Sequence, residues 1–372
     1  MNRILISCGG TGGHLAPGIA VAQNLIAEGH ECMLLTSKKL IDGKLCEKYP
    51  EIEISSTPGV GLKRSPFGII LFFIQLFLGV FICFYRFYKF KPNLVISFGG
   101  YTSLSSVMVA KLLGVVIFLH EANRVPGKAI RVLGKYANKV YLPEGVFCKR
   151  IATRKIFTCG YPVRNEIKRI AKVNSRRTLG LSEENKILLV VGGSQGAQSL
   201  NNWVLQNFEK FTDLGVDVCC LTGLLNETRG KKTHTNQSGK THSCHLIPFS
   251  DQMSLYLCAA DVIVSRAGAG SIAEIVECEV PSILVPYKFA ADNHQLMNAR
   301  FLERQGGTVV VEQDNLDQLF DEVCELLFND WLQEKFIKKC GWIKKRNDCS
   351  QMYLDIERIL LNSNKDKLGL SR

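Results

Sequence analysis

Several patterns that would reveal the class of this chain at once are missing from its 372 residues. We expect no signal peptide, because the strand-like run RILIS already begins at Arg3. No C-x-x-C spacing occurs among the fourteen cysteines, so their number alone does not indicate a disulfide framework. We therefore predict reduced, mostly buried thiols in a cytoplasmic protein.

Two nucleotide-binding motifs are incomplete. The stretch CGGTGGHLAPG has the glycine spacing of a Walker A loop from Gly13 to Gly18, but Ile19 stands where that loop needs its lysine. Leu15 occupies the place of the third glycine of a dinucleotide fingerprint, which leaves a nicotinamide oxidoreductase as a weak alternative. No D-x-D occurs either, so we predict neither ATP hydrolysis nor a carboxylate-held metal on a nucleotide pyrophosphate.

Acidic residues are fewer than basic ones, 34 against 46, which gives a formal net charge of +12. This excess fits a nucleic acid, an anionic membrane surface or an anionic substrate. Only FYRFYKFKP, residues 84–92, interleaves aromatic and basic side chains, and no nucleic-acid-binding motif accompanies it. We predict no nucleic-acid partner.

The two halves of the chain repeat one pattern. ILISCGGTGG (4–13) matches ILLVVGGSQG (187–196), and NLVISFGGYTS (93–103) matches DVIVSRAGAGS (261–271). In each, an apolar run ends in a glycine turn, and helical patterns separate the runs, as in parallel sheets covered by helices on both faces. We therefore predict an α/β fold with two doubly wound domains whose ligands bind at the carboxyl ends of the strands.

Domain boundaries are predicted from changes along the chain. Pro162, in CGYPVRNEI, follows the last strand-like run of the first half, so we place the hinge there. Residues 1–162 would form the N-terminal domain and 163–349 the C-terminal one. The tail, 350–372, contains the amphipathic pattern MYLDIERILL and is expected to pack back on the first domain.

The glycine turns are predicted to bind phosphate, because amide N–H groups and the dipole at a helix N-terminus favour anions. His14 follows the first turn and has an imidazole suited to removing a proton near neutral pH, unless it only caps or packs the helix. Ser194 offers a hydroxyl to a second phosphate. Ser271 and Glu274 suit a helix cap and a sugar, although a capping box explains both nearly as well.

Two further polar stretches follow buried strands. In HEAN, Glu121 is either acid/base machinery with His120 or a polar residue at a helix start. Residues 293–298 carry the side chains of Asn293, His294, Gln295 and Asn298, which suit recognition of hydroxyl groups. Without a metal, the negative charge that develops on a departing nucleotide diphosphate has to be stabilised by backbone amides and by a cation such as Arg164.

An apolar segment, Phe67–Tyr85, runs for 19 residues without a charge. It is long enough to cross a bilayer core of roughly 30 Å. A crossing would split one α/β domain, and the flanks are basic on both sides, so a helix partly inserted at the membrane surface is favoured over a span. A buried core helix fits less well, because aromatics and leucines occupy every face.

Seven short motifs follow one another along nearly the whole chain: GGTGGH, SFGGYTS, HEAN, GYPVR, GGSQGA, RAGAGS-x-x-E and HQ-x-x-NA. In this order they resemble the MurG family of glycosyltransferases. Its members are peripheral membrane enzymes of GT-B architecture, in which two Rossmann-like domains face each other across a cleft. They transfer N-acetylglucosamine from UDP-GlcNAc to lipid I at the cytoplasmic face of the bacterial inner membrane, making lipid II for peptidoglycan.

The resemblance implies that the second domain holds the donor. Ser194 and Arg164 would lie near its phosphates, and Glu274 near the ribose. Gln295 would contact the sugar hydroxyls, and the backbone of Phe249 and Ser250 the uracil. The other residues implied at the donor are Thr11, Gly12, Gly13, Asn123, Ala269, Gly270 and Ser271.

The acceptor, an undecaprenyl-pyrophosphoryl-MurNAc-peptide, is implied on the first domain. Its pyrophosphate would lie near the loop from Gly10 to Gly13, with Asn123 beside both substrates. The second acceptor turn is formed by Gly99, Gly100, Tyr101 and Thr102. Phe67–Tyr85 corresponds to the hydrophobic patch with which such enzymes touch the membrane.

Three positions depart from the family pattern. Ala122 replaces a common glutamine, Tyr161 an asparagine and Leu104 a glycine. These changes concern the acceptor side more than the donor side.

The mechanism that we predict is direct displacement with inversion and without a metal cofactor. A base, His14 or else Glu121, deprotonates the C4 hydroxyl of N-acetylmuramic acid, which attacks the anomeric carbon. Two alternatives remain: a glycosyltransferase of the same architecture acting on another lipid, and a non-catalytic subunit that binds the sugar nucleotide.

Overall fold

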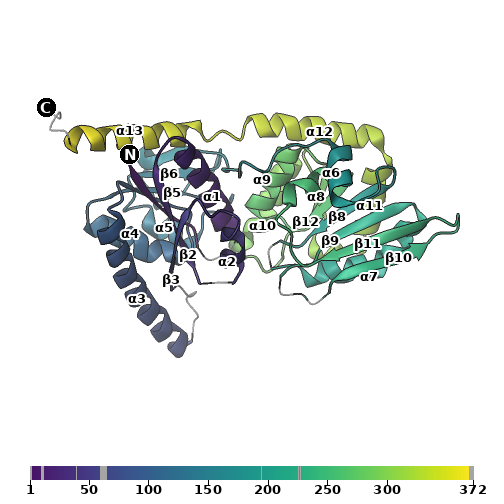
Figure 1. Ribbon diagram of the computed structural model, residues 1–372, viewed down its shortest axis with the longest axis horizontal. Coiled ribbons are helices and arrows are strands. Elements are labelled where there is room, and N and C mark those ends of the chain that lie inside the picture. The colour runs from purple at the N-terminus through teal and green to yellow at the C-terminus, as the bar shows by residue number, and fades with distance from the viewer. Residues whose placement is uncertain are drawn as a thin grey trace. The chain divides into compact units, whose positions relative to one another are not determined.

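A computed structural model describes residues 2–9, 12–38, 40–58, 65–193, 195–224, 226 and 228–367. The chain divides into two compact units (Figure 1). The first comprises Met1–Asn165 and Asn347–Arg372, and the second Glu166–Arg346.

The first unit contains a seven-stranded parallel sheet in the order β3-β2-β1-β4-β5-β6-β7. Its central strands form because short apolar runs bury both faces, as in β1, where Ile4, Leu5 and Ile6 are fully buried. The strands are β1 Arg3–Ser7, β2 Glu31–Ser37, β3 Glu53–Thr57, β4 Leu94–Ser97, β5 Val116–His120, β6 Lys139–Leu142 and β7 Ile156–Thr158.

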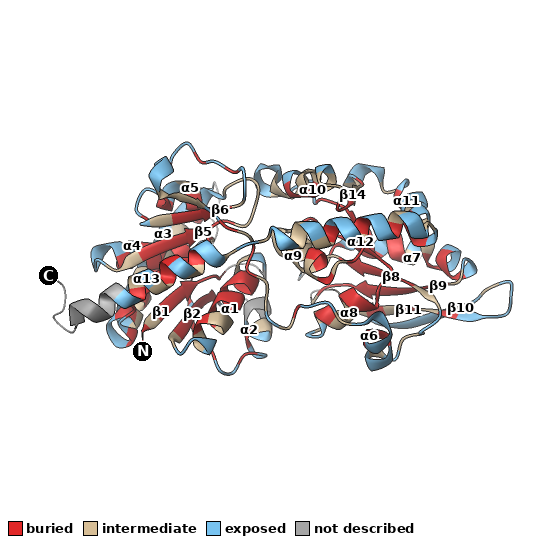
Figure 2. Cartoon of the chain, turned by 90° about the horizontal axis from the view of Figure 1, so that it is seen from above, coloured by how far each residue is buried: buried red, intermediate tan, exposed pale blue. Residues whose placement is uncertain are grey.

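Helices cover both faces of this sheet. Ile4 and Ile6 pack in one core with α1 and α13, whereas Leu5 packs in the other with α3, α4 and α5. The helices are α1 Gly12–Ala27, α2 Leu40–Cys46, α3 Pro66–Phe90, α4 Thr102–Leu112, α5 Lys128–Leu133 and α13 Ser350–Lys367, with the short η1 at Thr153–Lys155. The buried stripe of α13 lies over the sheet of the first unit (Figure 2).

The second unit repeats the arrangement in the order β10-β11-β9-β8-β12-β13-β14. All its neighbours are parallel except β10, which pairs antiparallel with β11 at the polar edge. The strands are β8 Lys186–Val191, β9 Val216–Leu221, β10 Gly230–Thr235, β11 Thr241–Ile247, β12 Val262–Ser265, β13 Ser282–Leu284 and β14 Val309–Val310.

Helices cover this second sheet in the same way, and α7, α11 and α12 contribute to its main core. They are α6 Lys172–Leu179, α7 Gln198–Asp213, α8 Met253–Ala259, α9 Ala269–Cys278, α10 His294–Arg304, α11 Leu319–Phe328 and α12 Asp330–Lys345, with the short η2 Ala291–Asn293 and η3 Gln313–Asn315. The predicted pair of doubly wound α/β domains is confirmed, except for the antiparallel strand β10, which the prediction of parallel strands missed.

Each sheet has a point at which the strand order reverses direction. This topological switch point lies between β1 and β4 in the first unit and between β8 and β12 in the second. The loops after these four strands hold the four glycine turns singled out in the sequence. Ligands of doubly wound sheets bind at such points, because the loops on either side diverge toward opposite faces.

The C-terminal helix α13 is tied to the first sheet by a buried carboxylate. Asp355 pairs with the ammonium of Lys139 at 2.6 Å and accepts a hydrogen bond from the Tyr141 hydroxyl at 2.9 Å. Burial by itself raises the pKa of Asp355, but hydrogen bonds from Lys139, Gln351 and Tyr141 outweigh it and hold the pKa below its ordinary value.

We expect Asp355→Ala to lower the free energy of unfolding of the first unit by roughly 2–4 kcal/mol, because it leaves a buried hydroxyl and an ammonium without their partner. A carboxylate with a lowered pKa stabilises at neutral pH, so this difference should shrink as the pH falls through the carboxyl range. Urea unfolding should be followed by circular dichroism, since all three tryptophans (Trp203, Trp331 and Trp342) lie in the second unit. Removing the exposed side chain of Arg358, 3.8 Å from the same carboxylate, is the matched control and should cost almost nothing.

Candidate functional site

Two loops meet at the switch point of the first unit. A Cβ atom on Gly100 would lie 2.6 Å from the carbonyl oxygen of Gly9, and Gly100 has a φ of 82°. Thr102 donates a hydrogen bond to the same oxygen at 3.3 Å. The backbone after β1 and the backbone after β4 therefore touch, and only glycine fits at Gly100.

His14 lies over this contact, in the first turn of α1. Cβ atoms built on Gly100 and Gly99 would lie 3.4 Å from its Nδ1 and 3.7 Å from its Nε2, respectively. The structure thus brings the imidazole to the turn after β4, 85 residues further along the chain than His14 (99 minus 14). Tyr101 in this turn is half exposed and Thr102 is buried.

Some predicted residues cannot be placed with these. Gly10, Thr11 and Ser194 lie outside the described residues, and Gly12 is described only as the first residue of α1. His14, Gly99, Gly100, Tyr101 and Thr102 are brought together at one edge of the sheet.

Glu121, the alternative base, organises the loop after β5. One of its carboxylate oxygens accepts hydrogen bonds from the backbone N–H and the side-chain amide of Asn123, at 2.9 and 3.0 Å. The other accepts one from the N–H of Gly127 at 2.6 Å, just before α5. A buried carboxylate that holds three donors is engaged in positioning this loop, so the geometry favours His14 over Glu121 as the base.

His120, next to Glu121, is a structural residue. Its Nε2 lies 2.8 Å from the carbonyl oxygen of Gly160, and its ring packs against Phe98. Burial lowers the pKa of His120, so its imidazole is neutral and Nε2 carries the proton that Gly160 accepts. The acid/base pairing of His120 with Glu121 is therefore not supported by the geometry.

Arg164 belongs to the first unit, although it was predicted at the donor phosphates. Its guanidinium donates a hydrogen bond to the hydroxyl of Tyr49 at 3.2 Å and is half-buried. Arg164 lies one residue before Asn165, the last residue of the first segment of this unit.

In the second unit the loop after β8 passes against the loop after β9. Gly196 has a φ of 77°, and a Cβ atom there would lie 2.0 Å from the carbonyl oxygen of Thr222. As in the first unit, a close backbone contact at the carboxyl edge of the sheet excludes a side chain, but here it joins the loops after β8 and β9. Ala197 then leads into α7, whose N-terminus is capped by no side chain of the described residues.

The N-terminus of α9 is the clearest anion site among the described residues. Its N-cap is Gly268, no side chain caps it in the described part of the chain, and its first turn contains no acidic residue. The amides of Ala269, Gly270 and Ser271 are half-buried at the carboxyl edge of the sheet. The capping-box alternative for Ser271 and Glu274 is wrong, because Ser271 lies inside the helix, three residues after the N-cap.

Arg266 supports this helix start and was missed in the sequence. It lies between β12 and α9, is 6% exposed, and donates to the carbonyl of Val285 at 3.1 Å and the hydroxyl of Ser199 at 2.8 Å. Its guanidinium also lies 5.4 Å from the ring centre of Tyr287. Burial lowers its pKa to about 10, so it stays charged at neutral pH. The sequence feature that could have indicated Arg266 is a single arginine between an apolar, strand-like run and a glycine turn.

Gln295 and Asn298 project from α10 beside the same turn. Gln295 accepts a hydrogen bond from the N–H of Tyr287 at 2.9 Å, and Asn298 donates to the carbonyl of Ala267 at 3.2 Å. These contacts fix Gln295 near the start of α9. In the loop after β11, the Ser250 hydroxyl accepts the N–H of Gln252 at 3.0 Å, which orders the segment implied to contact uracil.

A metal-ligating group occurs elsewhere among the described residues. Glu28, His30 and Glu357 have ligand atoms within 4.8 Å of one another, beyond the C-terminal end of α1. That end of α1 is at the amino edge of the sheet, opposite the glycine turns, so this group does not belong to the candidate site.

The helix α3 carries a large exposed apolar surface. It is the one helix of the described residues that is long and apolar enough to cross a membrane, and 17% of its most apolar stretch is buried. Its C-terminal part packs on the core through Cys83, Phe87 and Phe90. The buried-core interpretation of this segment is therefore wrong. The large apolar residues exposed on α3 are Phe67, Ile69, Ile70, Phe73, Ile74, Phe77, Leu78, Phe81, Phe84, Tyr85 and Tyr88.

The free half of α3 is on the same side of the first unit as the glycine turns. A Cβ atom on Gly79 would lie 3.4 Å from the carbonyl of Pro58, which directly follows β3 at the carboxyl edge of the sheet. Residues 66–78 therefore project beyond that edge, as the ribbon shows (Figure 1). At 1.5 Å per residue, this part is about 20 Å long.

Comparison with known proteins agrees with the two units. The glycosyltransferase family 28 N-terminal domain matches residues 4–142, and the family 28 C-terminal domain matches residues 187–346. A protein of Opitutus terrae named UDP-N-acetylglucosamine–N-acetylmuramyl-(pentapeptide) pyrophosphoryl-undecaprenol N-acetylglucosamine transferase is 43% identical, over 96% of this chain and 95% of its own. A protein of the same name from Prochlorococcus marinus is 35% identical over 84% of each.

Solved structures show the same fold. MurG of Acinetobacter baumannii superposes with a TM-score of 0.66 at 22% identity, covering 97% of this chain and 99% of its own. The Streptomyces glycosyltransferase SsfS6, solved with thymidine diphosphate, has a TM-score of 0.59 at 14% identity, covering 93% of this chain and 95% of its own.

We expect Glu121→Ala to destabilise the first unit by roughly 1–3 kcal/mol, because three N–H donors of Asn123 and Gly127 lose the buried carboxylate that accepts from them. If Glu121 only positions this loop, any activity that remains should keep the pH dependence of the unchanged enzyme. Urea unfolding and a pH profile of the remaining activity test this. A loss of the acidic limb of the profile with unchanged stability would instead assign the base to Glu121.

Proposed function

The chain belongs to glycosyltransferase family 28, and from this premise we propose that it transfers N-acetylglucosamine from UDP-GlcNAc to an undecaprenyl-pyrophosphoryl-N-acetylmuramyl-pentapeptide. The product is lipid II, the precursor of peptidoglycan. The observation that carries this conclusion is the 43% identity to a transferase of that name along 96% of the chain.

The second unit is proposed to bind the donor. UDP carries a diphosphate, and the uncapped N-terminus of α9 offers amides and the positive end of a helix dipole. The buried charge of Arg266 beneath that turn adds to the positive potential. Gln295, which accepts a hydrogen bond from the N–H of Tyr287, is proposed to contact the hydroxyls of N-acetylglucosamine, and Glu274, on α9, the ribose.

The first unit is proposed to bind the acceptor and to supply the base. His14 takes the proton of the C4 hydroxyl, whose oxygen attacks the anomeric carbon of the donor while the bond to UDP breaks, so the configuration inverts. The ring of His14 lies beside Gly99 and Gly100, at the edge where the acceptor pyrophosphate is proposed to lie. Arg164, Ser194, Thr11 and Asn123 complete the proposed set, with Arg164 as the cation for the departing phosphate.

The first unit is also proposed to sit on the membrane that holds the lipid acceptor. The projecting part of α3 is about 20 Å long, shorter than a hydrocarbon core of about 30 Å, so partial insertion into one leaflet fits better than a crossing. Because this part extends beyond the carboxyl edge of the sheet, insertion brings the His14 edge to the bilayer. We propose a peripheral location on the cytoplasmic face of the membrane, where a UDP-sugar donor and the lipid acceptor meet.

Transfer is proposed to need no metal ion. To test it, the purified protein is incubated with radiolabelled UDP-GlcNAc and a short-chain lipid I analogue in the presence of EDTA, and label in the lipid and release of UDP are measured. Transfer to the analogue supports the reaction and its metal independence. Donor binding without transfer would contradict it, and transfer to a diacylglycerol instead would assign another acceptor.

We expect His14→Ala to lower kcat by roughly 10²- to 10⁴-fold, the usual contribution of a general base. The KM for UDP-GlcNAc should stay nearly unchanged, since the donor is proposed to bind the other unit. His234→Ala, on the exposed strand β10, is the matched control and should keep full activity. If His14→Ala weakened UDP-GlcNAc binding as much as it lowered kcat, His14 would not be the general base.

We expect the double change Phe73→Ser and Phe77→Ser to weaken binding to anionic vesicles at least tenfold, because each buried phenylalanine contributes about 1.5–3 kcal/mol. Both side chains are well exposed, so the fold should survive. Vesicle co-sedimentation measures the effect, with Phe328→Ser and Trp331→Ser, exposed on the second unit, as the matched control. Similar losses in both pairs would place the membrane surface elsewhere.

A further inference from the structure

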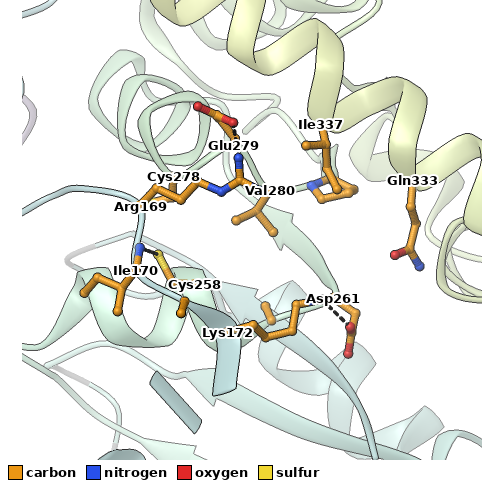
Figure 3. A pocket seen from close by; sticks show the side chains of 13 residues that line it. Arg169, Ile170, Lys172, Cys258, Asp261, Cys278, Glu279, Val280, Gln333 and Ile337 are labelled. Atoms are coloured by element: carbon orange, nitrogen blue, oxygen red, sulfur yellow. Dashed lines mark hydrogen bonds and ion pairs between the residues drawn. The ribbon is translucent and has the colours of Figure 1, made fainter. Parts of the chain in front are cut away.

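A cavity of about 330 Å³ lies in the second unit, away from the proposed donor residues (Figure 3). It is bordered by the segment before α6, the C-terminal ends of α8 and α9, and α12. Asp261 and Pro281, which precede β12 and β13, place it at the amino edge of the sheet, opposite the start of α9. None of its lining residues belongs to the site described above.

Two cysteines line this cavity with their sulfur atoms together. Cys258 is in the last turn of α8 and Cys278 is the last residue of α9. Their sulfur atoms lie 3.5 and 3.9 Å from the same carbonyl oxygen, that of Lys168, and the two side chains hydrogen-bond to each other. All fourteen cysteines are free, so this pair is a dithiol.

The surroundings of Cys258 favour its thiolate. The hydrogen bond from Cys278 is the largest influence, and with the N–H of Ile170 at 3.3 Å, the Ser254 hydroxyl and the charge of Arg169 it lowers the pKa of Cys258 to about 7. The hydrogen bond to Cys258, burial and the charges of Glu274 and Glu277 raise the pKa of Cys278. Near neutral pH, a substantial fraction of Cys258 is therefore thiolate, whereas Cys278 keeps its proton.

Other buried thiols of the chain behave in the opposite way. Burial raises the pKa of Cys32, Cys219 and Cys244 to about 12, because no donor offsets the loss of water. The remaining charges at the cavity are paired: Arg169 with Glu279 at 2.5 Å and Lys172 with Asp261 at 2.7 Å. These pairs give the cavity a polar rim and leave the two sulfur atoms as its reactive groups (Figure 3).

We propose that Cys258 is a nucleophilic thiol and that Cys258 and Cys278 form a reversible disulfide by exchange with a low-molecular-weight disulfide that enters the cavity. The Cys258 thiolate attacks one sulfur of the small disulfide, whose S–S bond breaks and releases one thiolate. Cys278 loses its proton and attacks the Cys258 sulfur of the mixed disulfide, which releases the second thiolate. The protein loses two hydrogens and two electrons, and the small disulfide becomes two thiols.

The disulfide is expected to act on the donor site, a consequence that rests on the proposed function. A disulfide brings its sulfur atoms to about 2.05 Å, closer than two hydrogen-bonded thiols, so the ends of α8 and α9 have to approach. The opposite end of α9 carries the proposed phosphate amides, and α8 follows the loop of Ser250. We expect the oxidised protein to bind UDP several-fold more weakly.

The test uses the purified full chain and oxidised glutathione at pH 7.5, followed by peptide mapping. The expected product is a Cys258–Cys278 disulfide that dithiothreitol reverses. Cys278→Ser should stop at a mixed disulfide on Cys258, and Cys258→Ser should not react at the pair. Cys349→Ser is the matched control: it removes one thiol of the other hydrogen-bonded pair, Cys159–Cys349, and should react as the unchanged protein does.

A second measurement needs no substitution. Iodoacetamide should alkylate Cys258 before the other buried cysteines, with a rate that falls tenfold per pH unit below about 7. No disulfide between Cys258 and Cys278, or alkylation of the other buried cysteines first, would overturn the proposal. Disulfide formation with unchanged UDP affinity would overturn only the coupling to the donor site, and a reduced protein that does not bind UDP would contradict the proposed function instead.

Discussion

The candidate sites depend on a contact between two backbones at the carboxyl edge of each sheet. In the first unit the turn after β4 meets the carbonyl of Gly9 through Gly100, and in the second the loop after β8 meets the carbonyl of Thr222 through Gly196. A side chain at either glycine would push the loops apart. Because they stay together, the helix N-termini that follow keep their amides at the ligand edge, and His14 can lie on the turn of a strand distant in sequence.

The buried positive charge at the proposed donor site is that of Arg266, and no carboxylate of the described residues pairs with it. Among the described residues its partners are carbonyl oxygens, the Ser199 hydroxyl and the ring of Tyr287. Burying such a charge costs free energy, yet carbonyl groups satisfy its donors without cancelling its field. The positive potential therefore adds to that of the α9 dipole, and a diphosphate bound there would offset part of the cost of burial.

The sequence was sufficient for features that repeat locally. Short apolar runs before glycine turns predict β1, β4, β8 and β12, and the helix α3 follows from a run of apolar residues after Ser65, which caps it. Contacts between residues that are distant in the sequence produce no local sequence pattern from which they could be predicted. Three such contacts depend on the order of the strands in the sheet. They are the hydrogen bond between Asp355 and Tyr141, the position of His14 over Gly99 and Gly100, and the three hydrogen bonds that Glu121 accepts.

Buried polar residues escaped prediction for a related reason. Arg266 looks in the sequence like a surface residue between a strand and a glycine turn, because the carbonyls that it binds come from the loop after β13. Ser271 and Glu274 have the spacing of a capping box, but the helix begins one residue after Gly268, which puts both inside it. In each case the local pattern was compatible with two structures, which the sequence alone does not distinguish.

The exposed surface of α3 is tolerable only because its other end is fixed. Cys83, Phe87 and Phe90 bury that end in the core, and Gly79 lets the helix approach the backbone of Pro58. The apolar half is therefore a rigid projection and not a loose arm, and its direction is set by the sheet. A lipid surface that buries this half covers the aromatic side chains that water leaves exposed, and it fixes the glycine turns at a set height above the lipid. In the proposed function, the lipid contact that covers this apolar surface would therefore also bring the glycine turns and His14 to the membrane.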